Sequence, residues 1–93
     1  MTNKIGNTIY TDTAQTFGGL PLILTGIILH CNHASNNAIV ELGDANTSST
    51  MLKLELPNSE KSKYYNLSGS PINFRSGLEI NVLTDAEITL ITK

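Results

Sequence analysis

The sequence predicts an all-β fold: a small antiparallel β-sandwich of about eight strands, immunoglobulin-like or jelly-roll-like. Three observations predict it. Apolar and polar residues alternate with a period of two, no sustained helical periodicity is found, and turn residues recur about every 8–12 positions. Because 93 residues suffice for one domain, we expect residues 1–93 to form a single sandwich, with residues 1–20 as a candidate N-terminal arm.

Two strands are expected in the first third of the chain. Thr8–Thr11 is a short one. Leu22–Cys31 is a long one, in which Gly26 marks either a β-bulge or a point where other atoms approach the backbone closely.

Two more strands are expected in the middle. Ala38–Leu42 is followed by the polar loop Gly43–Ser49, whose Asp and Asn side chains we expect to bond to their own backbone. Met51–Leu56 then alternates strictly between Leu and charged residues, and Pro57 ends it. Such alternation is typical of a strand with one buried and one solvated face.

The last third predicts three strands. A turn separates Pro71–Phe74 from Leu78–Val82, and Gly77 in this turn is free to adopt a positive φ. A short polar link over residues 83–86 joins Leu78–Val82 to Glu87–Leu90, which predicts a β-hairpin.

Composition and charge exclude several classes of protein. Thr, Asn and Ser make up 29 of the 93 residues and charged residues only 15%, which argues against a coiled coil and against disorder. The net charge is −2 and the basic residues are scattered, so we expect no nucleic-acid partner. No run of about 18 apolar residues is present, so we expect no membrane span. Met1–Gly6 lacks the apolar core of a secretory signal, and a single Cys allows no internal disulfide, so we expect synthesis in a cytoplasm.

One short cluster contains residue types that bind zinc or act in thiol catalysis. His30, Cys31 and His33 lie within four positions. His30 and Cys31 point to opposite faces of an extended strand, and the chain has no further His or Cys, so a zinc site within one chain lacks its fourth usual ligand. A site shared between chains is the alternative. We expect Cys31 to be a small buried residue, and we expect no metal, no cofactor and no catalytic residue.

The other residues that could form a catalytic, calcium or sugar site are better explained by structural roles. The acidic residues alternate with apolar positions or lie in turns, so we expect a solvated face and not a catalytic carboxylate pair. The loop Gly43–Ser49 is not followed by the Glu that ends a calcium loop. Tyr64 and Tyr65 are adjacent and face opposite ways, so only one could stack on a sugar, and we favour core packing for the aromatic residues. We therefore expect a protein that is not an enzyme.

The strand Leu22–Cys31 predicts a contact with a partner. By simple alternation both of its faces are apolar, whereas a two-layer sandwich buries only one face of a strand. Either the segment Thr8–Phe17 covers the second face, or another copy or a larger partner does. We favour a partner, with a homo-trimer ahead of a monomer. The candidate interface residues are Leu22, Leu24, Ile27 and Ile28.

The order of segments along most of the chain carries a family resemblance. The segments are Gly6–Thr11, Leu22–His30, Ala38–Asp44, Met51–Leu56 and Phe74–Leu78, followed by a final hairpin. In this order they resemble the small all-β virion proteins of tailed bacteriophages. Leu22 and Leu24 depart from the pattern, because relatives often carry polar or charged residues there, and the pair His30-Cys31 departs as well.

The resemblance implies a structural protein of the virion, without catalytic residues. Proteins of this kind decorate or cement capsids, form knobs or fibres, or complete the tail. Among these roles we favour decoration or cementing of the capsid surface through contacts between subunits, with capsid or other virion proteins as partners, after synthesis in the host cytoplasm. The alternative is a small module that binds carbohydrate or a cell-surface ligand through loops at one end of the sandwich.

Overall fold

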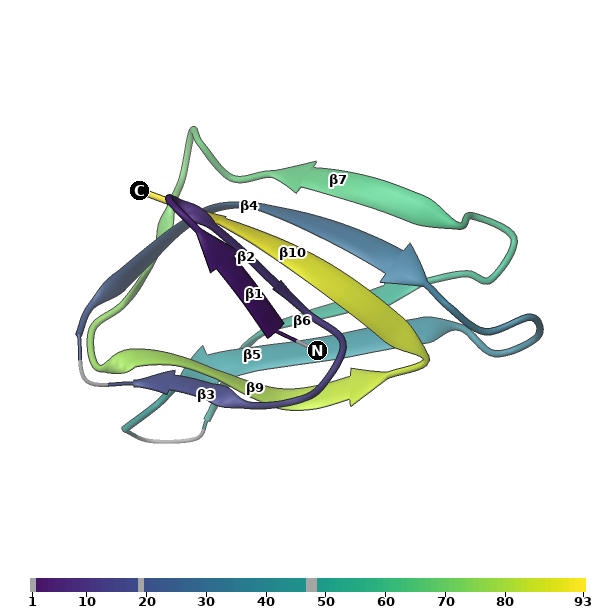
Figure 1. Ribbon diagram of the computed structural model, residues 1–93, viewed down its shortest axis with the longest axis horizontal. Coiled ribbons are helices and arrows are strands. Elements are labelled where there is room, and N and C mark those ends of the chain that lie inside the picture. Colours follow the sequence, from purple (N-terminus) through teal and green to yellow (C-terminus); the bar gives the residue numbers. More distant parts are fainter. Residues whose placement is uncertain (1, 19, 47–48) are drawn as a thin grey trace.

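The computed structural model describes residues 2–18, 20–46 and 49–93. Within these ranges the chain forms ten strands and no helix, and every strand pair is antiparallel (Figure 1). The strands are β1 (Thr2–Ile5), β2 (Thr8–Thr11), β3 (Thr16–Gly18), β4 (Leu22–Cys31), β5 (Ala38–Asp44), β6 (Thr50–Leu56), β7 (Ser62–Asn66), β8 (Ile72–Phe74), β9 (Gly77–Thr84) and β10 (Ala86–Thr92). The predicted all-β sandwich is confirmed, with two strands more than expected.

The strands are arranged in two layers. The larger sheet has the order β1-β2-β10-β4-β7. Along the same side of β4, residues 26–30 pair with β7 and residues 22–24 pair with β8. The smaller sheet has the order β3-β9-β5-β6. No helix in the described part of the chain is long and apolar enough to cross a membrane.

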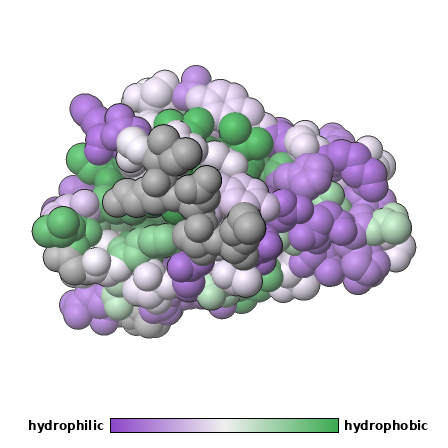
Figure 2. Space-filling view, viewed as in Figure 1, coloured by the Kyte–Doolittle hydropathy of each residue, from purple (hydrophilic) through white to green (hydrophobic). Residues whose placement is uncertain are grey.

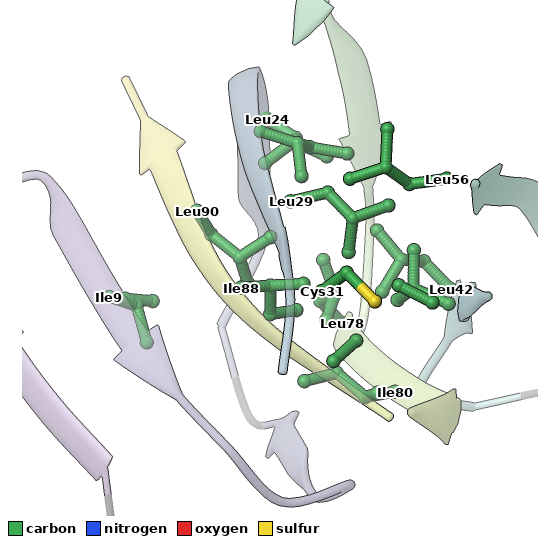
Figure 3. Close-up of a cluster of buried hydrophobic side chains, with 14 of the residues drawn as sticks. Ile9, Leu24, Leu29, Cys31, Leu42, Leu56, Leu78, Ile80, Ile88 and Leu90 are labelled. Atoms are coloured by element: carbon green, nitrogen blue, oxygen red, sulfur yellow. The ribbon is translucent and has the colours of Figure 1, made fainter. Parts of the chain in front are cut away.

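Aliphatic side chains from both sheets form the core between the layers (Figure 3). Ile88 and Leu90 of β10 face Val40 and Leu42 of the smaller sheet's β5, and none of the four is more than 1% exposed. The period-two alternation places these residues on the inner face and their polar neighbours outside. The buried Thr11 is satisfied, because its hydroxyl donates to the carbonyl oxygen of Thr13 at 3.0 Å.

A β-bulge changes the face that β4 presents to the core. Ile91 of β10 pairs with Gly26, but the next residue, Thr92, pairs with Leu24, so Thr25 is an extra residue in β4. Leu24 and Ile27 are three positions apart, and both are fully buried. The expectation that β4 is apolar on both faces is corrected, since simple alternation takes no account of the extra residue.

The described N-terminal residues add strands to both sheets. β2 pairs with β10, with Ile9 opposite Leu90, and β3 pairs with β9, with Phe17 opposite Leu78. β10 lies between β2 and β4, so this segment extends the larger sheet and does not cover the outer face of β4. Within the candidate arm at residues 1–20, β1, β2 and β3 belong to the two sheets, and residues 1 and 19 lie outside the described ranges.

β9 and β10 do not form the hairpin that the short link between them predicts. β9 pairs with β3 and β5 in the smaller sheet, whereas β10 pairs with β2 and β4 in the larger sheet. Asp85 alone connects them, with a φ of 54°, and its carbonyl oxygen accepts a hydrogen bond from the N–H of Asn32 at 3.1 Å. The left-handed conformation of this one residue carries the chain from one layer to the other.

Candidate functional site

The outer face of the larger sheet carries a row of four residues from four strands. Tyr10 of β2 lies opposite Thr89 of β10, which lies opposite Ile28 of β4. Ile28 in turn lies opposite Tyr64 of β7. Residues directly opposite each other in paired strands point to the same face, so the four side chains are neighbours. We call Tyr10, Thr89, Ile28 and Tyr64 the tyrosine row.

The tyrosine row is most open at its β7 end. Tyr64 is 54% exposed and Ile28 is 38% exposed, while Tyr10 and Thr89 are half-buried. A single exposed apolar side chain is ordinary, but an aromatic ring beside an aliphatic side chain forms a continuous apolar patch. The row therefore offers an aromatic and aliphatic surface on a sheet that holds its side chains in fixed register.

The absence of a side chain at Gly26 leaves room for the ring of Tyr64. A Cβ atom at Gly26 would lie 3.0 Å from Cε1 of Tyr64 and 3.3 Å from its hydroxyl oxygen, so the ring lies over the bare backbone of β4. Gly26 also adjoins the extra residue Thr25. The close approach expected at Gly26 is confirmed, and the β-bulge lies one residue earlier, at Thr25.

Polar side chains flank the row. Nδ1 of His30 and Oγ of Ser62 form a hydrogen bond of 2.8 Å. The hydroxyl of Tyr10 donates to Oε1 of Glu87. This hydrogen bond to a carboxylate is the largest cause that raises the pKa of Tyr10 from 10.0 to about 12, because it stabilises the neutral phenol. Tyr10 is thus anchored to the sheet by its polar end.

The predicted interface residues are only partly at the surface. Leu24 and Ile27 are fully buried in the core, so a folded chain cannot present them to a partner. Leu22 lies opposite Phe74 of β8 and packs against the core, where it is half-buried. Ile28 alone of the four belongs to the tyrosine row. The expected interface is therefore corrected, and the contact surface on this face is the row around Ile28.

The aromatic residues divide between the core and the surface. Phe74 is fully buried, and Tyr65 packs against the core as expected. The expectation of core packing is wrong for Tyr10 and Tyr64, which lie on the outer face of the larger sheet. Alternation in Thr8–Thr11 already places Tyr10 on the face opposite Ile9, but only the strand pairing brings Tyr10 and Tyr64 into one row.

The His and Cys residues do not converge. Cys31 is 3% exposed, and its thiol donates to the carbonyl oxygen of Asn36 at 3.3 Å, so the expected small buried Cys is confirmed. His33 lies in the loop after β4, where its Nδ1 accepts the N–H groups of Ser35 at 3.0 Å and Asn36 at 2.9 Å. His30 lies on the outer face of the sheet. Residues 2–18, 20–46 and 49–93 contain no group of three side chains that could hold a metal ion.

A hollow of about 390 Å³ opens at one end of the sandwich. It lies between the turn at Gly6 and Asn7 and the end of β10, and it is lined by apolar residues such as Phe17 and Ile23. Among its described lining residues, only Lys93 has an ionisable side chain. Figure 2 shows that hydrophilic residues gather at the opposite end of the molecule, which carries the β4–β5 and β6–β7 loops. The described lining residues offer no pair of ionisable side chains for acid–base chemistry.

A second, shallow hollow of about 460 Å³ lies beside the turn between β8 and β9. At its edge the carboxylate of Asp44 accepts the N–H of Asn46 at 2.9 Å and the N–H of Ser76 at 3.2 Å. These two hydrogen bonds stabilise the charged form and hold the pKa of Asp44 below its ordinary value of 3.8. The bond to Asn46 confirms that this Asp bonds to its own loop, whereas residues 47 and 48 of the loop lie outside the described ranges.

Comparison of the chain with protein-family models, curated proteins and solved structures finds no match.

Proposed function

We propose that the chain is a structural protein of a phage virion, which decorates or cements the capsid surface by binding neighbouring virion proteins. The observation that carries the proposal is the tyrosine row, in which Ile28 lies beside Tyr64 and Tyr10 follows beyond Thr89 on one sheet face. Tyr is enriched at the centres of protein interfaces. The resemblance to small all-β virion proteins supports the same conclusion.

The chemistry of the row suits contact with a protein surface. The Tyr64 ring supplies a large contact area with few rotatable bonds, so little conformational entropy is lost when it is buried. Ile28 adds apolar area beside it, and the polar pair His30–Ser62 supplies the rim that surrounds such a contact. A capsid presents many copies of its subunits, so modest contacts at each site suffice for firm attachment.

In this proposal the chain acts by binding and not by catalysis. The end hollow has Lys93 as the one ionisable side chain among its described lining residues, which supports a non-catalytic role. Its partners are capsid or other virion proteins, and its location is the virion.

Binding to virions by matched charge variants tests the proposal. Particles produced without the chain are mixed with the purified wild type, Ile28→Lys or Leu20→Lys, and the bound copies are counted after sedimentation. Leu20 is a suitable control because it is 77% exposed and lies outside the tyrosine row. We expect the wild type and Leu20→Lys to bind alike and Ile28→Lys to bind at least about tenfold more weakly, because the partner surface must then desolvate a charge. A wild-type chain that does not bind particles would refute the proposal.

One observation favours a second candidate, a carbohydrate-binding module. Tyr64 is 54% exposed, and Ser62 and Asn66 share its face of β7, so hydrogen-bonding groups lie on both sides of an open ring. This arrangement favours a sugar site on the sheet face over one on the end loops. A glycan that raises the melting temperature of the wild type but not of Tyr64→Ala would support this candidate. Particle binding that free glycans do not inhibit would support the structural role.

A further inference from the structure

β6 is the free edge of the smaller sheet (Figure 1). Its seven residues make it longer than β1, β3 and β7, which form the other described sheet ends. A strand at a sheet edge presents a line of N–H and C=O groups that can pair with another strand. Edge strands are commonly protected by Pro, by bulges or by charged residues that point inward.

β6 has little of this protection between Leu52 and Leu56. The residues that point inward are all Leu, and Pro57 comes only after the strand. The register with β5 is continuous over this stretch, and the β-bulge of β6 lies before it, where Met51 is an extra residue between Thr50 and Leu52. Leu52 and Leu54 pack against the core yet remain half-exposed, because no described strand lies beyond them.

We propose that β6 pairs with β6 of a second copy of the chain, antiparallel and about a two-fold axis at Leu54. The two smaller sheets then continue as one sheet across the dimer. This surface is separate from the tyrosine row, and the inference does not depend on the proposed function. It gives a dimer where the sequence alone favours a trimer.

Charge complementarity selects this register. With the axis at Leu54, Lys53 of each copy lies opposite Glu55 of the other, and both pairs lie on the exposed outer face. On the inner face Leu54 lies opposite its own copy, and Leu52 lies opposite the second copy's Leu56. Opposite charges across paired strands are stabilising.

The neighbouring registers lack this complementarity. An axis at Lys53 would place two Lys residues opposite each other, and an axis at Glu55 would place two Glu residues opposite each other, both of which are unfavourable. A shift by one residue would set an inward Leu against an outward charge, because side chains alternate between the two faces. The complementary charges of β6 therefore favour a second copy of the chain as its partner.

A charge-reversal cycle on the full chain tests the proposal. Self-association of the wild type, Lys53→Glu, Glu55→Lys and the double variant is measured by sedimentation equilibrium. Each single variant sets two like-charged pairs opposite each other, so we expect about tenfold weaker dimerisation or more, and near wild-type dimerisation in the double variant. Lys63→Glu changes an exposed Lys on β7 at the edge of the other sheet and should leave dimerisation unchanged. A monomeric wild type, unaffected single variants or an unrestored double variant would each overturn the proposal.

Crosslinking tests the position of the axis. Only a residue on the two-fold axis meets its own copy, so Leu54→Cys should give a disulfide-linked dimer with oxidised glutathione. In Leu52→Cys the two sulfur-bearing residues are offset by four positions, about 13 Å along the strand, and should not crosslink. The wild type is the control for Cys31, which is buried. Crosslinking at residue 52, or at neither position in folded variants, would place the axis elsewhere and overturn the inference.

Discussion

Ile27 and Ile28 are neighbours on β4, and their side chains lie on opposite sides of the larger sheet. Ile27 is fully buried, whereas Ile28 is 38% exposed. The extra residue Thr25 places Leu24 and Ile27 on the same inner face although they are three positions apart. The face to which each side chain of β4 points therefore decides which of the two isoleucines a partner can contact.

A charged substitution at Ile27 should destabilise the fold far more than the same substitution at Ile28. Ile27→Lys buries an unpaired charge, and we expect a loss of about 4–5 kcal/mol, comparable to the whole stability of a small domain. Ile28→Lys keeps its charge in water, and we expect a change below about 1 kcal/mol. Urea unfolding followed by circular dichroism measures both. Equal losses in the free energy of unfolding would show that Ile27 and Ile28 do not lie on opposite faces of the larger sheet.

Gly77→Ala should destabilise the fold more than Gly26→Ala does. Gly77 adopts the predicted positive φ, at 100°, and a Cβ there would lie 2.2 Å from the carbonyl oxygen of Phe17, so the β3–β9 pair must shift. We expect Gly77→Ala to cost about 2–4 kcal/mol. Gly26→Ala meets mainly the movable ring of Tyr64 and should cost less than about 1 kcal/mol.

Thermal and urea unfolding of the two variants check this difference, and the Tyr64 ring resonances in NMR spectra should shift in Gly26→Ala. A Gly77→Ala variant as stable as the wild type would argue against a close approach of β3 to this turn.

Substitutions of Asp85 test the single-residue connection between the sheets. Its φ of 54° is accessible to Gly and strained for a β-branched residue. We expect Asp85→Val to lose about 1–2 kcal/mol and Asp85→Gly to stay within about 0.5 kcal/mol of the wild type. Equilibrium unfolding in urea gives both values. A Val variant that matches the Gly variant would be inconsistent with a left-handed residue here.

The hydroxyl of Tyr10 should lose its proton at a higher pH than an ordinary Tyr, because the carboxylate of Glu87 accepts its hydrogen bond. Its pKa is raised from 10.0 to about 12 in the folded chain, so the stabilisation is present below pH 10.0 and is lost as the pH rises through about 12. Glu87→Gln removes the carboxylate and should lower the pKa of Tyr10 towards 10.0. Ultraviolet absorbance of tyrosinate follows the titration, with Tyr10→Phe to identify the signal. An unchanged titration in Glu87→Gln would count against this contact.

Asp44 should make stability depend on pH in acid. Its pKa in the folded chain lies below the ordinary 3.8, because it accepts the N–H groups of Asn46 and Ser76. The stabilisation is therefore present above pH 3.8 and is lost as the pH falls through the folded pKa. We expect Asp44→Asn to be less stable at neutral pH and to lose less stability on acidification. Unfolding midpoints in urea at a series of pH values measure both, and parallel pH profiles for the two proteins would contradict the assignment.

Seven of the strands were predictable because their signal is local, whereas β1, β3 and β7 were not expected as individual strands. The alternation in Met51–Leu56 places each Leu inward within a few residues of chain, and the structure contains this strand as β6. The turn at Gly77 was predictable for the same reason, since its residue type alone permits a positive φ.

Strand pairing was not predictable, because it joins residues that are far apart in the chain. The polar link expected over residues 83–86 has the length of a hairpin turn, yet β9 and β10 pair within different sheets. The bulge at Thr25 is defined by the register against Ile91 and Thr92, which lie more than 60 positions away. The tyrosine row depends on three such registers, so the sequence identified Ile28 but not its neighbours.

A reconstruction of the virion at side-chain resolution tests the central claim most directly. We predict that the chain is bound on the capsid surface and that Ile28 and Tyr64 are buried against a neighbouring virion protein. A particle without the chain, or one in which the outer face of the larger sheet is turned to solvent, would contradict the account.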